Sequence, residues 1–247
     1  MPNINDTYFD GYYKDIWRSI IPDVLTEKEI EFMIPYFNLN ADSRVLDLMC
    51  GYGRHAAALG RKGIQVTAVD NLSDYIDDLN MIIGKENLPV RSFLSHVLDF
   101  KTDDRFDLVI CMGNSLNFFN TSDTVNIFSN IFSYLHKGGH LLINSWSIAE
   151  IAIKNFKEET NSQIDNLKFQ TKSKIHSNPT RIETESIIMT PDGKTERKSG
   201  IDYIFSLLEL EKMLADTGLK LKEVYSIPGR KKFSEGEPRA YLVAVKP

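Results

Sequence analysis

The order of apolar and polar residues along the chain predicts strands that alternate with helices. Short apolar runs at residues 44–50, 65–70, 90–94, 106–112 and 140–146 have the length of buried strands. The stretches between them carry apolar residues at helical spacing. Because parallel strands need crossover connections, this alternation predicts an α/β fold with a Rossmann-like, doubly wound and mainly parallel sheet.

The pattern changes after the fifth of these runs, where polar and apolar residues alternate one by one. Residues 168–176, 180–190 and 194–206 have the alternation of half-buried strands. Pro191-Asp192-Gly193 joins the last two of them and is typical of a tight turn. We therefore predict an antiparallel β insertion that folds over the large sheet as a lid.

The chain accordingly divides into four parts. Residues 1–40 are rich in aromatic side chains and are expected to form a helical cover. Residues 41–150 form the core, and residues 151–205 contribute a helix and the antiparallel lid. Residues 206–247 add a helix and two last strands, which bring the large sheet to seven strands.

Composition and charge narrow the class of function. Apolar residues make up 42% of the 247 residues and charged residues 26%, which is typical of a folded globular protein. The net charge of -5 offers no general field for a polyanion, so we expect no nucleic acid partner. No apolar run reaches the ~18 residues of a membrane span, and the first residues lack a signal-peptide pattern. We expect a cytoplasmic protein without a membrane partner, and the sequence leaves its oligomeric state unknown.

One segment carries the chemistry: an apolar strand that contains Asp47 leads into a turn with Gly51 and Gly53, directly before an alanine-rich helix. Glycines suit this turn because a ligand has to approach backbone amides at the helix N-terminus. Asp70 ends the next strand, where a carboxylate can accept hydrogen bonds from both hydroxyls of a ribose. These residues predict a nucleoside-binding site at the carboxyl edge of the sheet.

Two kinds of nucleoside cofactor fit this pattern. Gly51, Gly53 and Ala56 match the glycine fingerprint of dinucleotide sites, so an NAD(P)-dependent oxidoreductase is one alternative. In such sites the first glycine usually follows the strand at once, whereas Met49 and Cys50 intervene here. The arrangement instead resembles motif I of the class I S-adenosylmethionine-dependent methyltransferases.

The resemblance extends along most of the chain, because the later segments also follow the order of this family. Residues 106–119 resemble its fourth strand and following loop, and residues 135–146 resemble the turn into its fifth strand. Residues 219–227 and 239–247 resemble its antiparallel sixth and seventh strands. Within the family, the aromatic N-terminus and the loop after the fourth strand most resemble those of small-molecule N-methyltransferases. The resemblance implies S-adenosylmethionine as cofactor, with contacts from Tyr13, Trp17, Asp47, Met49, Gly51, Gly53, Asp70, Asn71, His96, Val97, Met112 and Asn114.

Two positions depart from the family's pattern. Met49 stands in the place of the usual first glycine of D-x-G-x-G-x-G, so the backbone there should approach the cofactor less closely. His96 stands where the family commonly has an acidic residue that meets the adenine amino group. The glycine turn and adenine recognition are therefore the two places where this chain should differ from its relatives.

The acceptor is expected to be a small polar metabolite with an amine nitrogen. A neutral amine needs no dedicated base, and the sequence offers no convincing base for a hydroxyl, so no catalytic residue is assigned. We expect the acceptor to contact Asn117, Trp146, Arg181 and Tyr203. The spacing of His, Cys and carboxylate residues does not indicate a metal site. A non-catalytic S-adenosylmethionine-binding protein is a second alternative.

Overall fold

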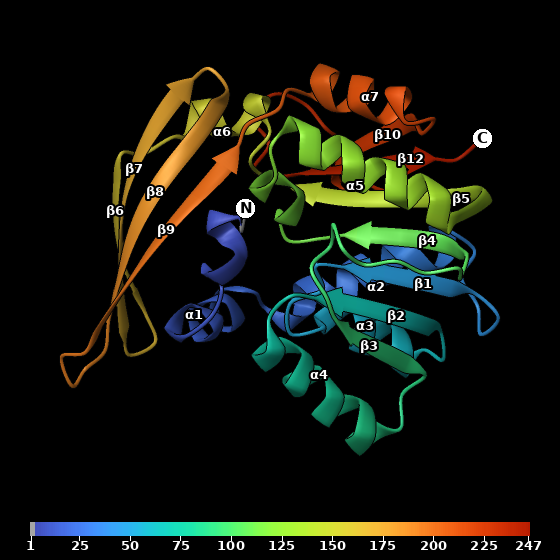
Figure 1. The fold of residues 1–247 in the computed structure, drawn as a ribbon, viewed down its shortest axis with the longest axis horizontal. Coiled ribbons are helices and arrows are strands. Elements are labelled where there is room, and N and C mark those ends of the chain that lie inside the picture. Colours follow the sequence, from blue (N-terminus) through green and yellow to red (C-terminus); the bar gives the residue numbers. More distant parts are fainter. Residues whose placement is uncertain (1–2) are drawn as a thin grey trace.

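The computed structural model describes residues 3–247 as a large mixed sheet with helices on both faces and a smaller antiparallel sheet beside it (Figure 1). The strand order of the large sheet is β11-β10-β12-β5-β4-β1-β2-β3. Its strands are β1 (Arg44–Leu48), β2 (Gln65–Asp70), β3 (Val90–Leu94), β4 (Phe106–Cys111), β5 (Leu135–Ser145), β10 (Lys220–Ile227), β11 (Lys231–Lys232) and β12 (Ala240–Val245).

The order in which the chain adds strands to this sheet reverses between β1 and β4. Strands β3, β2, β1, β4 and β5 are parallel, whereas β12, β10 and β11 pair in antiparallel fashion. After β3 the chain returns to the far side of β1 to form β4. In open α/β sheets, such a switch point at the carboxyl ends of the strands is where ligands bind.

Two hydrophobic clusters hold the helices on the sheet. Helices α2, α3 and α4 bury their apolar side chains on one face, and α5 and α7 bury theirs on the other. The central strands are buried on both sides, which is why their sequences are almost continuously apolar. The helical elements are η1 (Ile4–Thr7), α1 (Tyr12–Ile20), α2 (Asp23–Tyr36), α3 (Arg54–Arg61), α4 (Ser73–Glu86), η2 (Ser115–Phe118), α5 (Thr121–Tyr134), α6 (Ala149–Asn155) and α7 (Leu207–Asp216).

The large sheet has eight strands, one more than the seven predicted. The additional strand, β11, has two residues and pairs with β10 at the edge. A two-residue strand of lysines carries no apolar periodicity, so the sequence pattern does not reveal it.

The smaller sheet has the strand order β6-β7-β8-β9, with all neighbours antiparallel. Three of its strands lie where the alternating pattern predicts them, and Gly193 has the positive φ that the predicted turn requires (+85°). The strand β6 is mostly polar and exposed, so its pattern gave no signal. The strands are β6 (Glu159–Ile164), β7 (Leu167–Ser177), β8 (Thr180–Met189) and β9 (Thr195–Tyr203).

The N-terminal segment, residues 4–20, lies between the two sheets (Figure 1). Ile16 of α1 packs on Leu167 and Ile188 of the smaller sheet. The side chain of Asn5 donates to and accepts from the backbone of Ile201, and Tyr8 shares a hydrogen bond with Ser186. The same segment also contacts loops of the large sheet, because the Asn5 side chain donates to the carbonyl of Phe118 and the Asn71 side chain donates to the carbonyl of Asp6.

Candidate functional site

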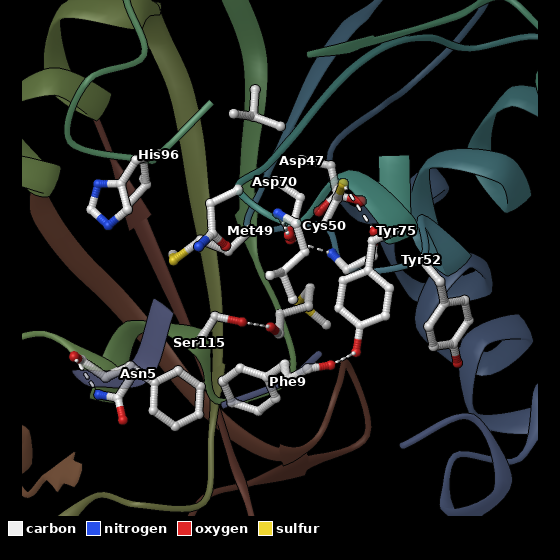
Figure 2. A pocket seen from close by; sticks show the side chains of 18 of the residues that line it. Asn5, Phe9, Asp47, Met49, Cys50, Tyr52, Asp70, Tyr75, His96 and Ser115 are labelled. Carbon is white, nitrogen blue, oxygen red and sulfur yellow. Dashed lines mark hydrogen bonds between the residues drawn. The ribbon is translucent and has the colours of Figure 1, made fainter. Parts of the chain in front are cut away.

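A partly open cavity lies at the carboxyl ends of β1, β2 and β4, next to the switch point of the sheet. The space free of protein atoms is about 910 Å³, which includes open solvent at its mouth. Figure 2 shows Asp47, Met49 and Asp70 on one side of the cavity and Asn5 and Phe9 on the other. The core therefore provides one wall, and the N-terminal segment provides the opposite wall.

The turn after β1 forms the floor of this cavity from residues with positive φ. Met49, Gly51 and Gly53 have φ of +58°, +57° and +76°. A Cβ atom added to Gly51 would enter open space, whereas one added to Gly53 would lie 2.5 Å from Leu79. Gly51 thus leaves room for a ligand, and Gly53 leaves room for helix α4. Met49 adopts a conformation that glycine would take without strain.

Asp70 is anchored at the end of β2 by backbone amides. Its carboxylate accepts hydrogen bonds from the N–H groups of Gly51 at 2.8 Å and Leu72 at 3.0 Å. Burial raises the pKa of Asp70, and these hydrogen bonds oppose that effect. The side chain lines the cavity and holds the glycine turn in place.

Asp47 presents a buried carboxylate to the same cavity. The residue is 1% exposed, and its Oδ2 atom has no hydrogen-bond partner among residues 3–247. Burial raises the pKa of Asp47 to about 7, although the charge of Arg54 opposes this shift. A buried acceptor without a partner is costly, so this oxygen is suited to a donor on a bound ligand.

Arg54, at the start of α3, also lines the cavity. Its guanidinium is held by a buried polar cluster centred on Glu29. Glu29 accepts hydrogen bonds from Arg54 at 2.7 Å, from His55 at 2.8 Å and from Tyr241 at 2.8 Å. Burial alone would raise the pKa of Glu29, but these partners lower it to about 2. Burial and the Arg54 charge lower the pKa of His55 to about 4. Glu29 therefore ties α2, α3 and β12 together below the cavity.

Nine of the twelve predicted cofactor contacts line the cavity. In addition to Asp47, Met49, Gly51 and Asp70, they come from α1, from the loop after each of β2 and β3, and from the end of β4. His96 lies 3.2 Å from the carboxylate of Asp6, so the N-terminal segment covers the region expected to hold adenine. The nine residues are Trp17, Asp47, Met49, Gly51, Asp70, Asn71, His96, Val97 and Met112.

The other three predicted cofactor contacts lie outside the cavity. Gly53 faces Leu79, as described above. Tyr13 packs into an aromatic group with Tyr8, Phe9 and Phe169. Asn114 is 1% exposed, and its side chain is fully used within the protein. Its role is to connect the loop after β4 to neighbouring segments.

The four predicted acceptor contacts also lie outside the cavity. Asn117 donates to the backbone carbonyls of Ser147 and Tyr203, and the ring of Tyr203 packs against the core. Arg181 pairs with the neighbouring Glu183 on the small sheet. Trp146 contacts a residue that lines the cavity, because its ring centroid is 5.9 Å from that of Trp17.

The sequence pattern did not identify the contributions of Asn5, Asp6, Phe9 and Tyr75 to the cavity. Tyr75 in α4 donates to the carbonyl of Phe9 at 3.0 Å, as Figure 2 shows. The aromatic richness of the N-terminus was a signal for Phe9. No local pattern marks Asn5 or Asp6, because their position depends on contacts with distant segments.

Within residues 3–247, no group of three or more His, Cys, Asp or Glu side chains is arranged to hold a metal ion. None of the helices in this range is both long enough and apolar enough to cross a bilayer.

The sequence of this chain is similar to those of known methyltransferases. Residues 45–139 match the family described as "Methyltransferase domain". A ubiquinone biosynthesis O-methyltransferase of Rickettsia bellii is 32% identical over 83 residues, which are 34% of this chain and 35% of that enzyme. A putative methyltransferase of Geobacillus sp. is 24% identical over 241 residues, 94% of this chain and 92% of that protein. The chain thus spans about a third of the first relative and nearly all of the second.

Solved structures share the whole architecture. A methyltransferase of Streptomyces caelestis superposes with a TM-score of 0.84 at 18% identity, over 98% of both chains. An S-adenosylmethionine-bound amino pentose methyltransferase of Micromonospora echinaspora has a TM-score of 0.73 at 17% identity, over 96% of this chain and 98% of that one. At these identities, the likeness shows a common fold that includes the smaller sheet.

Proposed function

We propose that this chain, in which residues 45–139 match the methyltransferase domain family, uses S-adenosylmethionine to methylate the amine nitrogen of a small polar metabolite. The observation that carries this proposal is the unpartnered carboxylate oxygen of Asp47, which lies against a cavity built on Gly51 and Asp70. A cofactor with both a cationic group and a ribose would satisfy these residues together.

The residues that line the cavity fit S-adenosylmethionine at several points. Asp47 suits the amino group of its methionyl part, and Arg54 suits the carboxylate of the same part. Asp70 suits the ribose hydroxyls, and Gly51 allows the backbone to lie close to the ligand. The face of Trp17 suits a sulfonium cation.

When bound, S-adenosylmethionine supplies an electrophilic methyl group. The contribution of this chain is to orient the acceptor in line with that group and to exclude water. The apolar side chains of Phe9, Met112, Phe118 and Phe119 line the cavity, and the N-terminal segment covers it. Such walls favour the neutral form of an amine, which is the nucleophilic form.

Two observations support a small amine acceptor. The chain has a net charge of -5, which disfavours a nucleic acid substrate. The amino pentose methyltransferase described above shares the fold of this chain along 96% of its length. All four proteins compared above are named as methyltransferases, which favours this proposal over an NAD(P)-dependent oxidoreductase.

The test is methyl transfer from S-adenosylmethionine to a panel of small amines, each paired with the hydroxyl compound of the same skeleton. We expect S-adenosylhomocysteine to form with at least one amine and not with its hydroxyl partner. Turnover with hydroxyl compounds alone would contradict the amine acceptor. Tight cofactor binding without any turnover would favour a non-catalytic S-adenosylmethionine-binding protein.

A further inference from the structure

A second carboxylate, that of Asp202, lies where the smaller sheet meets the large one. Asp202 is near the end of β9, and residues 198, 200 and 202 share one face of this strand because side chains alternate. On that face Lys198 and Gly200 contact the N-terminal segment. Asp202 is therefore on the side of the small sheet that faces the site.

The carboxylate of Asp202 is anchored through one of its two oxygens. Its Oδ1 atom accepts hydrogen bonds from Asn114 at 2.9 Å and from the Ser147 hydroxyl at 3.1 Å. Within residues 3–247, no hydrogen bond is formed by Oδ2, and the residue keeps part of its surface accessible. One oxygen is thus fixed, and the other is left for a ligand.

No cation of residues 3–247 neutralises this carboxylate. The lysine on the same face of β9, Lys198, is paired with Asp10 and Glu196. Burial raises the pKa of Asp202 to about 6, opposed only by the hydrogen bonds from Ser147 and Asn114. Tyr8 and Tyr13 are close enough for its charge to contribute to the raised pKa of each phenol, mainly a burial effect. An anionic side chain among neutral aromatic residues is complementary to an organic cation.

The hydrogen-bond partners of Asp202 connect it to the wall of the cofactor cavity. Asn114 follows Gly113, which lines the cavity and lies against the ring of Trp17. Ser147 follows Trp146, whose ring is next to that of Trp17. Asp202 is thus linked by hydrogen bonds to two residues whose sequence neighbours, Gly113 and Trp146, lie against Trp17.

We propose that Asp202 is the residue that binds the amino group of the methyl acceptor and takes up its proton. This inference rests on the function proposed above. The ammonium group of the acceptor pairs with Oδ2, and a proton moves from nitrogen to the carboxylate, which leaves a neutral amine. The nitrogen lone pair then forms the N–C bond while the S–C bond breaks, and its electron pair stays on sulfur. S-adenosylhomocysteine leaves, and the methylated ammonium product carries the positive charge that the sulfonium lost.

Asp202→Asn tests this role, because asparagine keeps the oxygen that Asn114 and Ser147 hold and removes the charge. Asp192→Asn, in the exposed turn of the same sheet, is the matched control. Protein saturated with S-adenosylhomocysteine is titrated with each amine of the panel and with its hydroxyl partner. Methyl transfer is measured in parallel with the amine that wild type binds best.

We expect wild type to bind at least one amine tenfold more tightly than its hydroxyl partner, and Asp202→Asn to lose this preference. Asp202→Asn should raise the KM for the amine at least tenfold, flatten the acid limb of the pH profile of kcat/KM and leave S-adenosylhomocysteine affinity within twofold. The inference is overturned if Asp202→Asn keeps the amine preference and the pH profile of wild type, or if wild type prefers no amine. Absence of any methyl transfer by wild type would contradict the proposed function instead.

Discussion

At the scale of single residues, the turn between β1 and α3 contains two glycines with different roles, which the sequence alone does not distinguish. Gly51 and Gly53 both occupy positions with positive φ, but only Gly51 lies beside open space. The motif predicts that both residues serve the cofactor. The neighbour of Gly53 is Leu79, which is 26 positions away and comes close only after α4 packs on the sheet.

Gly51→Ala tests the role of this space. A Cβ atom at Gly51 contacts no other part of the protein but takes room from the ligand, so we expect S-adenosylhomocysteine affinity to fall at least tenfold. The matched control is Gly63→Ala, because Gly63 also has positive φ and open surroundings but does not line the cavity. Each variant should lose roughly 1 to 2 kcal/mol of stability from backbone strain. Equal binding by both variants, measured by calorimetry, would contradict a ligand at Gly51.

Asp47→Asn should weaken S-adenosylhomocysteine binding without lowering the stability of the fold. At pH 8 the ionised Asp47 carboxylate opposes folding, because its folded pKa of about 7 lies above the value of 3.8 expected when it is exposed. This cost decreases as the pH falls from about 7 towards 3.8, below which both states are protonated. We expect Asp47→Asn to be at least as stable as wild type in urea at pH 8 and to bind S-adenosylhomocysteine at least tenfold more weakly. Asp42→Asn, at an exposed position, should change neither quantity, and unimpaired binding by Asp47→Asn would remove Asp47 from the site.

At the scale of elements, the local patterns were sufficient for the strands of the core and for three strands of the small sheet. They were insufficient for β6 and β11, which are short, polar and exposed. They also gave no sign that α2, α3 and β12 meet at Glu29, because the residues around it come from positions 54, 55 and 241. A buried ion pair of this kind is invisible until the elements have been assembled.

The buried histidine of this cluster gives a prediction for pH. The folded-state pKa of His55 is lowered to about 4, so it stays neutral while the unfolded chain binds a proton near pH 6.5. The contribution of the neutral His55 imidazole to the free energy of unfolding is fully present above pH 6.5 and is lost as the pH falls from 6.5 to 4. The difference in unfolding free energy between wild type and His55→Gln should therefore shrink by about 2 to 3 kcal/mol between pH 7.5 and pH 4.5. The same comparison with the exposed His136→Gln should show no such change, and a constant difference for His55→Gln would contradict a buried neutral imidazole.

At the scale of the whole molecule, the small sheet is connected to the cofactor cavity through the N-terminal segment. The sequence predicts a lid that contacts the acceptor, with Arg181 and Tyr203 as contacts. In the structure, β8 and β9 hold residues before and at the start of α1: Ser186 shares a hydrogen bond with Tyr8, and Glu196 accepts from the backbone N–H of Tyr12. Neither contact has a local signal, because each joins residues more than 170 positions apart.

Deletion of residues 178–198, closed by a short Gly-Ser link, should consequently affect both ligands. The deletion removes Ser186 and Glu196, and it frees the segment that carries Asp6 and Phe9 from its outer support. We expect S-adenosylhomocysteine affinity to fall at least fivefold and methyl transfer to be lost. The double variant Ser186→Ala, Glu196→Gln should show the same direction in a protein that still unfolds cooperatively, and Arg181→Ala should bind like wild type. Unchanged cofactor affinity in the deletion variant would show that the small sheet serves the acceptor alone.

We propose above all that the cavity at the carboxyl ends of β1, β2 and β4 binds S-adenosylmethionine. Calorimetric titration of the purified protein with S-adenosylhomocysteine, and with NAD⁺ in a parallel cell, tests it most directly. We predict one S-adenosylhomocysteine bound per chain, with affinity at least tenfold weaker in Gly51→Ala and retained in Gly63→Ala, and no heat of binding from NAD⁺. Binding of NAD⁺ in place of S-adenosylhomocysteine, or S-adenosylhomocysteine binding that Gly51→Ala leaves unchanged, would contradict this account of the site.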